Sequence, residues 1–130
     1  MTINKADKQK ILIVDEEPDI ITSLKMYLES QGFQIDGFAD PANALAHFKA
    51  DFYDLLILDI KMPQMNGFEL YKEVKKKDKR VKVFFLTALS EMHDYDAVKK
   101  EVFPKEGERY FMSKPIENED ILKRINRVIS

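Results

Sequence analysis

The stretch Leu55-Leu56-Ile57-Leu58-Asp59 decides the fold of this 130-residue chain. Four apolar residues in succession are typical of a strand that is buried on both faces of a parallel sheet. Asp59 comes directly after this apolar run. Residues 60–67, which follow it in the sequence, are predicted to form a loop. Because ligands bind at the carboxyl ends of strands in open α/β sheets, the sequence predicts a carboxylate at a binding edge.

Three other apolar runs are also followed by polar side chains: Ile11–Val14 by Asp15 and Glu16, Val83–Leu86 by Thr87, and Tyr110–Met112 by Ser113 and Lys114. If these runs are parallel neighbours, carboxylates, one hydroxyl and one lysine converge on a single edge of the sheet. Such a set of groups suits a metal-dependent acceptor of a phosphoryl group.

Strand and helix patterns alternate along the chain. Strands are predicted at residues 11–14, 33–38, 55–58, 81–86 and 110–112, and helices from 18 to a stop at Gly32, then at 41–48, 66–76, 90–100 and 118–129. This alternation predicts an α/β fold with a doubly wound, flavodoxin-like parallel sheet of five strands in the order 2-1-3-4-5 and helices on both faces. In that order the first and third strands are neighbours, so Asp15, Glu16 and Asp59 meet in space.

Composition excludes several classes of function. No apolar stretch approaches the roughly 18 residues that a membrane-spanning helix needs, and the N-terminus lacks the apolar core of a signal peptide. The absence of cysteine favours a cytoplasmic setting, and a net charge of −2 argues against a dedicated nucleic-acid binder. We expect a flexible N-terminus over residues 1–8 and one domain over residues 9–129.

The clustered carboxylates favour a metal ion and a covalent phosphoryl intermediate. Three carboxylates in one pocket repel one another, which a divalent cation with oxygen ligands, such as Mg²⁺, would relieve. Asp59 can also act as a nucleophile that forms an acyl phosphate. Lys114 and Thr87 would then each contact a phosphoryl oxygen.

Each of these residues also has an ordinary structural interpretation. Asp15 and Glu16 could form an acidic helix start, and Asp59 could be a turn residue. That interpretation requires four coincidences at the ends of four apolar runs, which favours the site. An FMN carrier of the same fold needs a phosphate loop after its first strand, where the acidic residues here would repel a phosphate.

Four motifs together resemble the receiver domain of two-component response regulators: Ile13-Val14-Asp15-Glu16-Glu17-Pro18, Leu58-Asp59-Ile60-Lys61-Met62-Pro63 with Gly67, Leu86-Thr87-Ala88, and Ser113-Lys114-Pro115. The resemblance covers about residues 9–129. It implies a phosphoacceptor, not an enzyme in the usual sense, that assists its own phosphorylation and dephosphorylation. Asp59 would receive the phosphoryl group from a histidine kinase or a phosphotransfer protein.

The resemblance also implies a ligand set. Mg²⁺ or Mn²⁺ would be held by Asp15, Glu16, Asp59 and the backbone carbonyl of Lys61. Glu16 stands where the family more often has Asp, and its greater length leaves room for contact with the metal through a water molecule. An unphosphorylated pseudo-receiver or a protein-interaction module is the alternative.

A switch and an output face are implied by the same resemblance. Thr87 and an aromatic residue, Phe111 with Tyr110 adjacent, would remodel the face formed by the fourth helix, the fifth strand and the fifth helix. The bond between Lys114 and Pro115 would be cis. This face would act on a protein target or on an effector domain. A phosphorylation-dependent homodimer is a further possibility that the resemblance implies. The charged segment 101–109, with Pro104, departs from the family pattern on this face.

Overall fold

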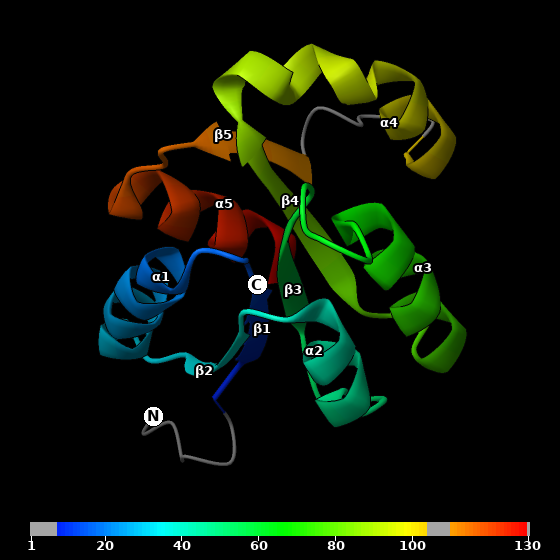
Figure 1. The fold of residues 1–130 in the computed structure, drawn as a ribbon. Helices are drawn as coiled ribbons and strands as arrows, with labels where there is room; N and C mark the ends of the chain where they lie inside the picture. The colour runs from blue at the N-terminus through cyan, green and yellow to red at the C-terminus, as the bar shows by residue number, and fades with distance from the viewer. Residues whose placement is uncertain (1–7, 104–109, 130) are drawn as a thin grey trace.

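The computed structural model describes residues 8–103 and 110–129, where five parallel strands form one sheet (Figure 1). The strands are β1 (Lys10–Val14), β2 (Gln34–Phe38), β3 (Leu55–Asp59), β4 (Lys82–Ala88) and β5 (Phe111–Lys114). Their spatial order is β2-β1-β3-β4-β5, which confirms the predicted fold class. Residues 1–7 of the N-terminus that we expected to be flexible, and residues 104–109 of the divergent segment, lie outside the described residues.

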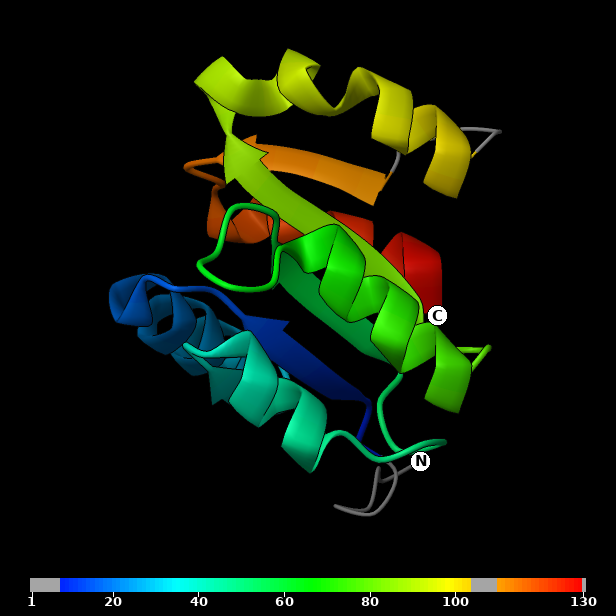
Figure 2. The same ribbon diagram turned by 45° about the vertical axis from the view of Figure 1, so that its right-hand side comes forward.

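Helices cover both faces of the sheet (Figures 1 and 2). They are α1 (Pro18–Ser30), α2 (Pro41–His47), α3 (Gly67–Lys77), α4 (Asp96–Val102) and α5 (Asn118–Ile129). α1 and α5 lie on one face, and α2, α3 and α4 lie on the other. None of the described helices is long and apolar enough to cross a membrane.

The continuous apolar runs supply both cores because successive side chains of a strand point to opposite faces. In β3, Leu56 and Leu58 belong to the core under α2, α3 and α4, whereas Leu55 and Ile57 belong to the core under α1 and α5. The same alternation holds in the other central strands. A central strand of this sheet therefore needs apolar residues at successive positions, because both of its faces are buried.

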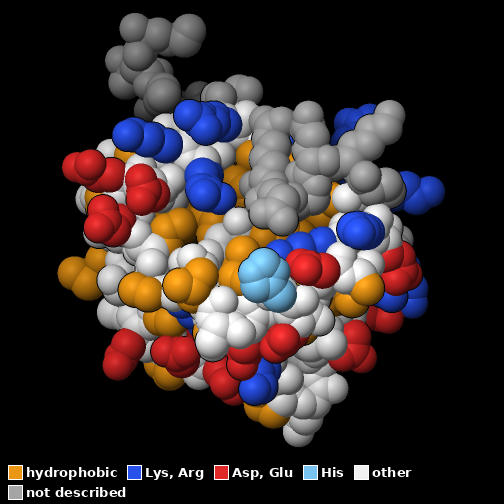
Figure 3. Space-filling model, turned by 90° about the horizontal axis from the view of Figure 1, so that it is seen from above, with side chains coloured by type: hydrophobic (Ala, Val, Ile, Leu, Met, Phe, Trp, Pro, Cys, Tyr) orange, Lys and Arg blue, Asp and Glu red, His pale blue; other side chains and the backbone are white. Residues whose placement is uncertain are grey.

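The segment after β4 is helical, as predicted for residues 90–100, but it forms two helices instead of one. Residues Leu89–Tyr95 form a 3₁₀ helix, η2, and α4 begins only at Asp96. Met92 and Tyr95 of η2 pack against the core three residues apart, which matches the three residues per turn of a 3₁₀ helix. Seen from above, hydrophobic side chains gather on the face that carries η2 and α4 (Figure 3).

The fifth strand is displaced from its predicted position. It runs from Phe111 to Lys114 and leaves out Tyr110. The pairing between β4 and β5 sets these bounds, since Thr87 of β4 lies opposite Ser113 of β5 and Ala88 lies opposite Lys114. Thr87 is consequently inside β4 instead of following it.

The loop between β3 and α3 returns to the strand that it left. The backbone N–H of Gly67 donates a hydrogen bond to the carbonyl of Ile60 at 2.9 Å. A Cβ atom at Gly67 would clash with the carbonyl oxygen of Asp59 and lie 3.1 Å from the Cα of Ile60. Glycine at this position therefore permits the loop to pack directly against Asp59.

We predict that Gly67→Ala lowers the free energy of unfolding by about 1–3 kcal/mol, because the new methyl group overfills a packed site. Urea unfolding measures the loss. Gly32→Ala is the matched control, since Gly32 has a φ of +97° with open space around its Cβ position. It should also lose stability, but only Gly67→Ala should shift the amide signals of Asp59 and Ile60. Unchanged signals in Gly67→Ala would contradict the close packing of this loop.

Candidate functional site

Two buried aspartates lie side by side at the carboxyl edge of the sheet. β1 and β3 pair in parallel with Val14 opposite Leu58, so Asp15 and Asp59, which follow these residues, reach the same edge. Asp15 is 0% exposed and Asp59 is 4% exposed. The pair that the sequence predicts is therefore present, and its two carboxylates are almost removed from solvent.

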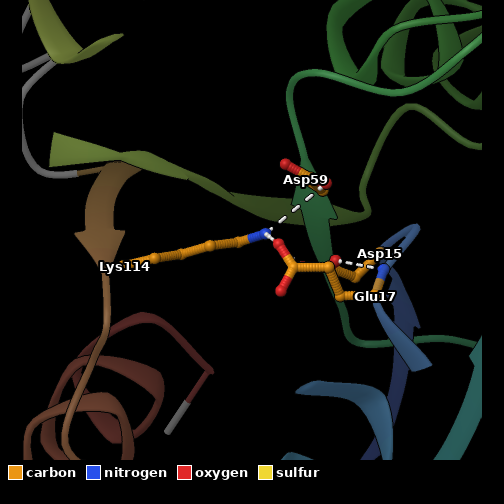
Figure 4. A network of polar contacts seen from close by, with 4 residues as sticks. All are labelled: Asp15, Glu17, Asp59 and Lys114. Atoms are coloured by element: carbon orange, nitrogen blue, oxygen red, sulfur yellow. Dashed lines mark hydrogen bonds and ion pairs between the residues drawn. The ribbon is translucent and has the colours of Figure 1, made fainter. Parts of the chain in front are cut away.

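Lys114 extends from the end of β5 toward both carboxylates (Figure 4). Its Nζ lies 2.8 Å from Oδ2 of Asp15, 3.5 Å from Oδ2 of Asp59 and 3.6 Å from Oε1 of Glu17. The ammonium thus joins β5 to β1 and β3 across the intervening strand β4. The peptide bond that follows, Lys114-Pro115, is cis, as the resemblance implied.

Burial and like charge govern the protonation of Asp59. Burial, together with the negative charge of Asp15, raises the pKa of Asp59 to about 6, although the charge of Lys114 and its hydrogen bond act in the opposite direction. Burial on its own would lower the pKa of Lys114, but its close ion pair with Asp15 and the nearby carboxylates of Asp59 and Glu17 raise it. The site therefore holds a firmly protonated lysine beside a carboxylate that ionises reluctantly.

Two oxygen atoms at this edge are available for a ligand. The Thr87 side chain is 1% exposed, and among the described residues its Oγ1 has no hydrogen-bond partner. Oδ1 of Asp15 accepts a hydrogen bond from the backbone N–H of Glu17 at 2.9 Å. Oδ2 of Asp15 lies in the ion pair with Lys114 but accepts no well-directed hydrogen bond from the described residues. Such unsatisfied buried oxygens are uncommon in native folds and point to a ligand.

The remaining predicted ligands lie at the rim of the site. Glu16 is exposed, and its charge contributes to the raised pKa of Asp59. The Lys61 side chain turns away to Glu91, with 3.2 Å between Nζ and Oε1. Within residues 8–103 and 110–129, no three His, Cys, Asp or Glu side chains form a ready-made metal cage. Glu16 as a ligand and the carbonyl of Lys61 stay predictions.

The predicted switch residues lie behind the site. The Phe111 side chain is 3% exposed, and its ring stacks on Phe85 with 5.2 Å between centroids. Tyr110 is partly buried and stacks on Phe103 at 4.4 Å. The structure therefore places both aromatic residues on the α4 side of the molecule, with Phe111 fully inside.

Sequence reasoning missed two contacts of the site. Glu17 pairs with Lys114, and Glu91 of η2 pairs with Lys61. The position of Glu17 directly after the acidic pair was a signal for the first contact. No sequence signal identifies the second contact, because it joins the loop after β3 to η2, whose 3₁₀ geometry the sequence did not predict.

A family model of the response regulator receiver domain matches residues 11–126. The chain belongs to the response regulator receiver family. The response regulator SaeR of Staphylococcus aureus is 32% identical to this receiver domain over 105 residues, 74% of this chain and 46% of SaeR. The chain therefore spans about half the length of the curated relatives that it matches.

Solved structures agree with the family. A CheY-like receiver domain protein from Methanospirillum hungatei superimposes with a TM-score of 0.78 at 28% identity, covering 92% of each chain. The response regulator TrrA from Thermotoga maritima, solved in complex with Mg²⁺ and BeF, gives a TM-score of 0.70 at 29% identity and covers 92% of this chain and 98% of TrrA. Both are similar to this receiver domain over nearly its full length.

We predict that Asp59→Asn stabilises the metal-free receiver domain at pH 8. The folded-state pKa of about 6 lies above the ordinary value of 3.8, so between these pH values the native state retains a proton that the unfolded chain has lost. The contribution of protonated Asp59 to the free energy of unfolding is fully present below about pH 4, and it is lost as the pH rises through about 6. A pKa difference of one corresponds to about 1.4 kcal/mol. After a discount for solvent screening, we expect Asp59→Asn to raise the free energy of unfolding by about 1–2 kcal/mol at pH 8.

Urea unfolding in EDTA at pH 8 and pH 4.5 measures this gain. The advantage of Asp59→Asn should shrink at the lower pH, where wild-type Asp59 is itself protonated. Asp94→Asn, at an exposed position on η2, should show no such dependence on pH. An equal advantage of Asp59→Asn at both pH values would refute the raised pKa.

Proposed function

We propose that this receiver domain accepts a phosphoryl group on Asp59 from a phosphohistidine. The observation that carries the proposal is the juxtaposition of Asp59 and Asp15 with Lys114 within 2.8–3.5 Å of both carboxylates. The buried, unpartnered Thr87 Oγ1 supports it, since a hydroxyl at this edge suits a ligand oxygen. Receiver domains in general are phosphoacceptors rather than conventional enzymes.

The transfer is a displacement at phosphorus. A carboxylate oxygen of Asp59 forms the new O–P bond while the P–N bond to the imidazole breaks, and the imidazole nitrogen leaves with the electron pair and takes up a proton. Lys114 neutralises charge on one phosphoryl oxygen, and the Thr87 hydroxyl donates a hydrogen bond to another. Catalysis of this kind consists mostly of positioning and charge neutralisation.

The residues at this edge fit a divalent cation. Asp15 and Asp59 are buried carboxylates whose repulsion contributes to the raised pKa of Asp59, and carboxylate oxygens are preferred ligands of Mg²⁺. Asp15 and Asp59 would hold Mg²⁺ or Mn²⁺, with Glu16 and the backbone carbonyl of Lys61 as further ligands. When bound, the cation would neutralise negative charge on Asp59 and on the incoming phosphoryl group.

Partners and output follow from the family. Two-component receiver domains work with sensor histidine kinases, and a kinase or a phosphotransfer protein is the proposed donor here. We infer that Thr87, Phe111 and Tyr110 relay phosphorylation to the face made by α4, β5 and α5. The recipient is a protein target or an effector domain, and phosphorylation-dependent homodimerisation is one form that the output can take.

We predict that Asp59→Asn abolishes phosphorylation, because the amide is not a nucleophile toward phosphorus. The receiver domain is incubated with acetyl phosphate and Mg²⁺, and intact-mass spectrometry detects the added phosphoryl group. The adduct should survive acid and be lost in alkali, as expected of an acyl phosphate. Asp54→Asn is the matched control, since Asp54 lies exposed just before β3 at the opposite end of the strand. Labelling of Asp59→Asn at the wild-type rate would refute the assignment.

We predict that Asp15→Ala weakens Mn²⁺ binding by about tenfold or more, which corresponds to about 1.4 kcal/mol. Glu16→Ala should weaken binding less, because Glu16 lies at the exposed rim. Calorimetric titration of the unphosphorylated protein measures both affinities. Asp19→Ala removes an equal charge from the first turn of α1 and should have little effect. Undiminished affinity in both Asp15→Ala and Glu16→Ala would remove the metal site from the proposal.

A further inference from the structure

The residue that α4 buries is a lysine. Lys99 is 6% exposed, whereas the other residues of Asp96–Val102 are partly or fully exposed. Lysine is almost never fully buried unless its ammonium group is paired, because desolvating a charge is costly. The phosphoryl chemistry proposed above does not use Lys99, so its burial requires a separate explanation.

The Phe111 ring is a close partner of the Lys99 ammonium. Lys99 Nζ lies over this ring, 4.9 Å from its centroid. The nearest described carboxylate oxygen is Oδ1 of Asp96 at 3.7 Å, on a side chain that is 54% exposed. The other oxygen of Asp96 lies 3.5 Å from His93 Nδ1. An exposed and shared carboxylate at this distance contributes little, whereas attraction between a cation and a ring strengthens when both are desolvated.

Phe111 is held from several sides. Its ring stacks on Phe85 at 5.2 Å, meets Phe103 edge-on at 6.1 Å and lies 6.0 Å from Phe68. These three partners come from β4, the end of α4 and α3, so aromatic rings of three elements surround Phe111. Lys99 adds the only charged group among the described residues that is recorded over this ring.

We propose that Lys99 is a positioning residue that holds Phe111 in its buried position through this cation–π contact and thereby couples α4 to β5. If the ring left the core, the desolvated ammonium would lose its aromatic partner and keep only the exposed carboxylate of Asp96. The departure of Phe111 therefore requires α4 to move as well, so that Lys99 can reach water. The ring and the helix behave as one unit, whether or not Asp59 is phosphorylated.

A single tryptophan can report on the buried position. The chain has no tryptophan, so Phe111→Trp supplies one fluorophore at the position in question. In that background Lys99→Gln removes the charge and keeps a polar side chain of similar length. We expect a red-shifted emission maximum and stronger acrylamide quenching in Lys99→Gln. Lys99→Arg should restore the original spectrum, because a guanidinium also binds an aromatic face.

Lys100→Gln is the matched control. Lys100 is the next residue of the same helix and is exposed, so the substitution removes an equal charge from α4 without affecting the ring. Its emission should equal that of the Phe111→Trp parent. All measurements use metal-free protein with no phosphodonor, so failure of Asp59 to accept a phosphoryl group would not alter these readouts.

A second measurement addresses the native ring, and it decides the question if Phe111→Trp does not fold. In the wild-type protein the ε-methylene protons of Lys99 should be shifted upfield by the ring current of Phe111, unlike those of Lys100. Phe111→Leu should abolish the shift, and Asp96→Asn should preserve it. The proposal is overturned if Lys99 and Lys100 give the same ε-proton shifts, or if folded Lys99→Gln leaves the tryptophan emission unchanged.

Discussion

The repulsion between two buried carboxylates is the constraint on which the site depends. Asp15 and Asp59 are neighbours because β1 and β3 pair in register, and both are almost fully desolvated. Lys114 is the cation that contacts both of them within the described residues, and it comes from the edge strand β5. A sheet order that separated β1 from β3, or that placed β5 elsewhere, would leave a buried charge without compensation, which folding does not tolerate.

The sequence was sufficient to predict the fold and the proximity of Asp15, Asp59 and Lys114. An apolar run such as Leu55–Leu58 can be satisfied only by burial on both faces, and its two alternate sets of side chains do enter two separate cores. The connection rules for alternating strands and helices leave few sheet orders, and 2-1-3-4-5 is one of the common doubly wound orders. Once that order is known, Asp15, Asp59 and Lys114 must meet, since each comes at the carboxyl end of its strand.

The parts that sequence reasoning did not reach depend on tertiary contacts. The 3₁₀ geometry of η2 is one of them, because Met92 and Tyr95 pack against the core at a spacing of three, whereas an isolated helical segment would favour the α form. The start of β5 at Phe111 is set by pairing with β4. The pair between Lys61 and Glu91 joins the loop after β3 to η2, and local sequence does not encode the distance between these two segments.

One face of β4 connects the site with α4. Phe85 and Thr87 are two residues apart in a strand, so their side chains point to the same side of the sheet. Phe85 stacks on Phe111, and Phe111 lies under the ammonium of Lys99. Ring contacts thus connect Phe85, which lies two residues before Thr87 in β4, with the buried cation of α4. Because a packed interior has low compressibility and transmits strain, displacement of the Phe85 ring would act on Phe111 and, through the cation–π contact, on Lys99 of α4.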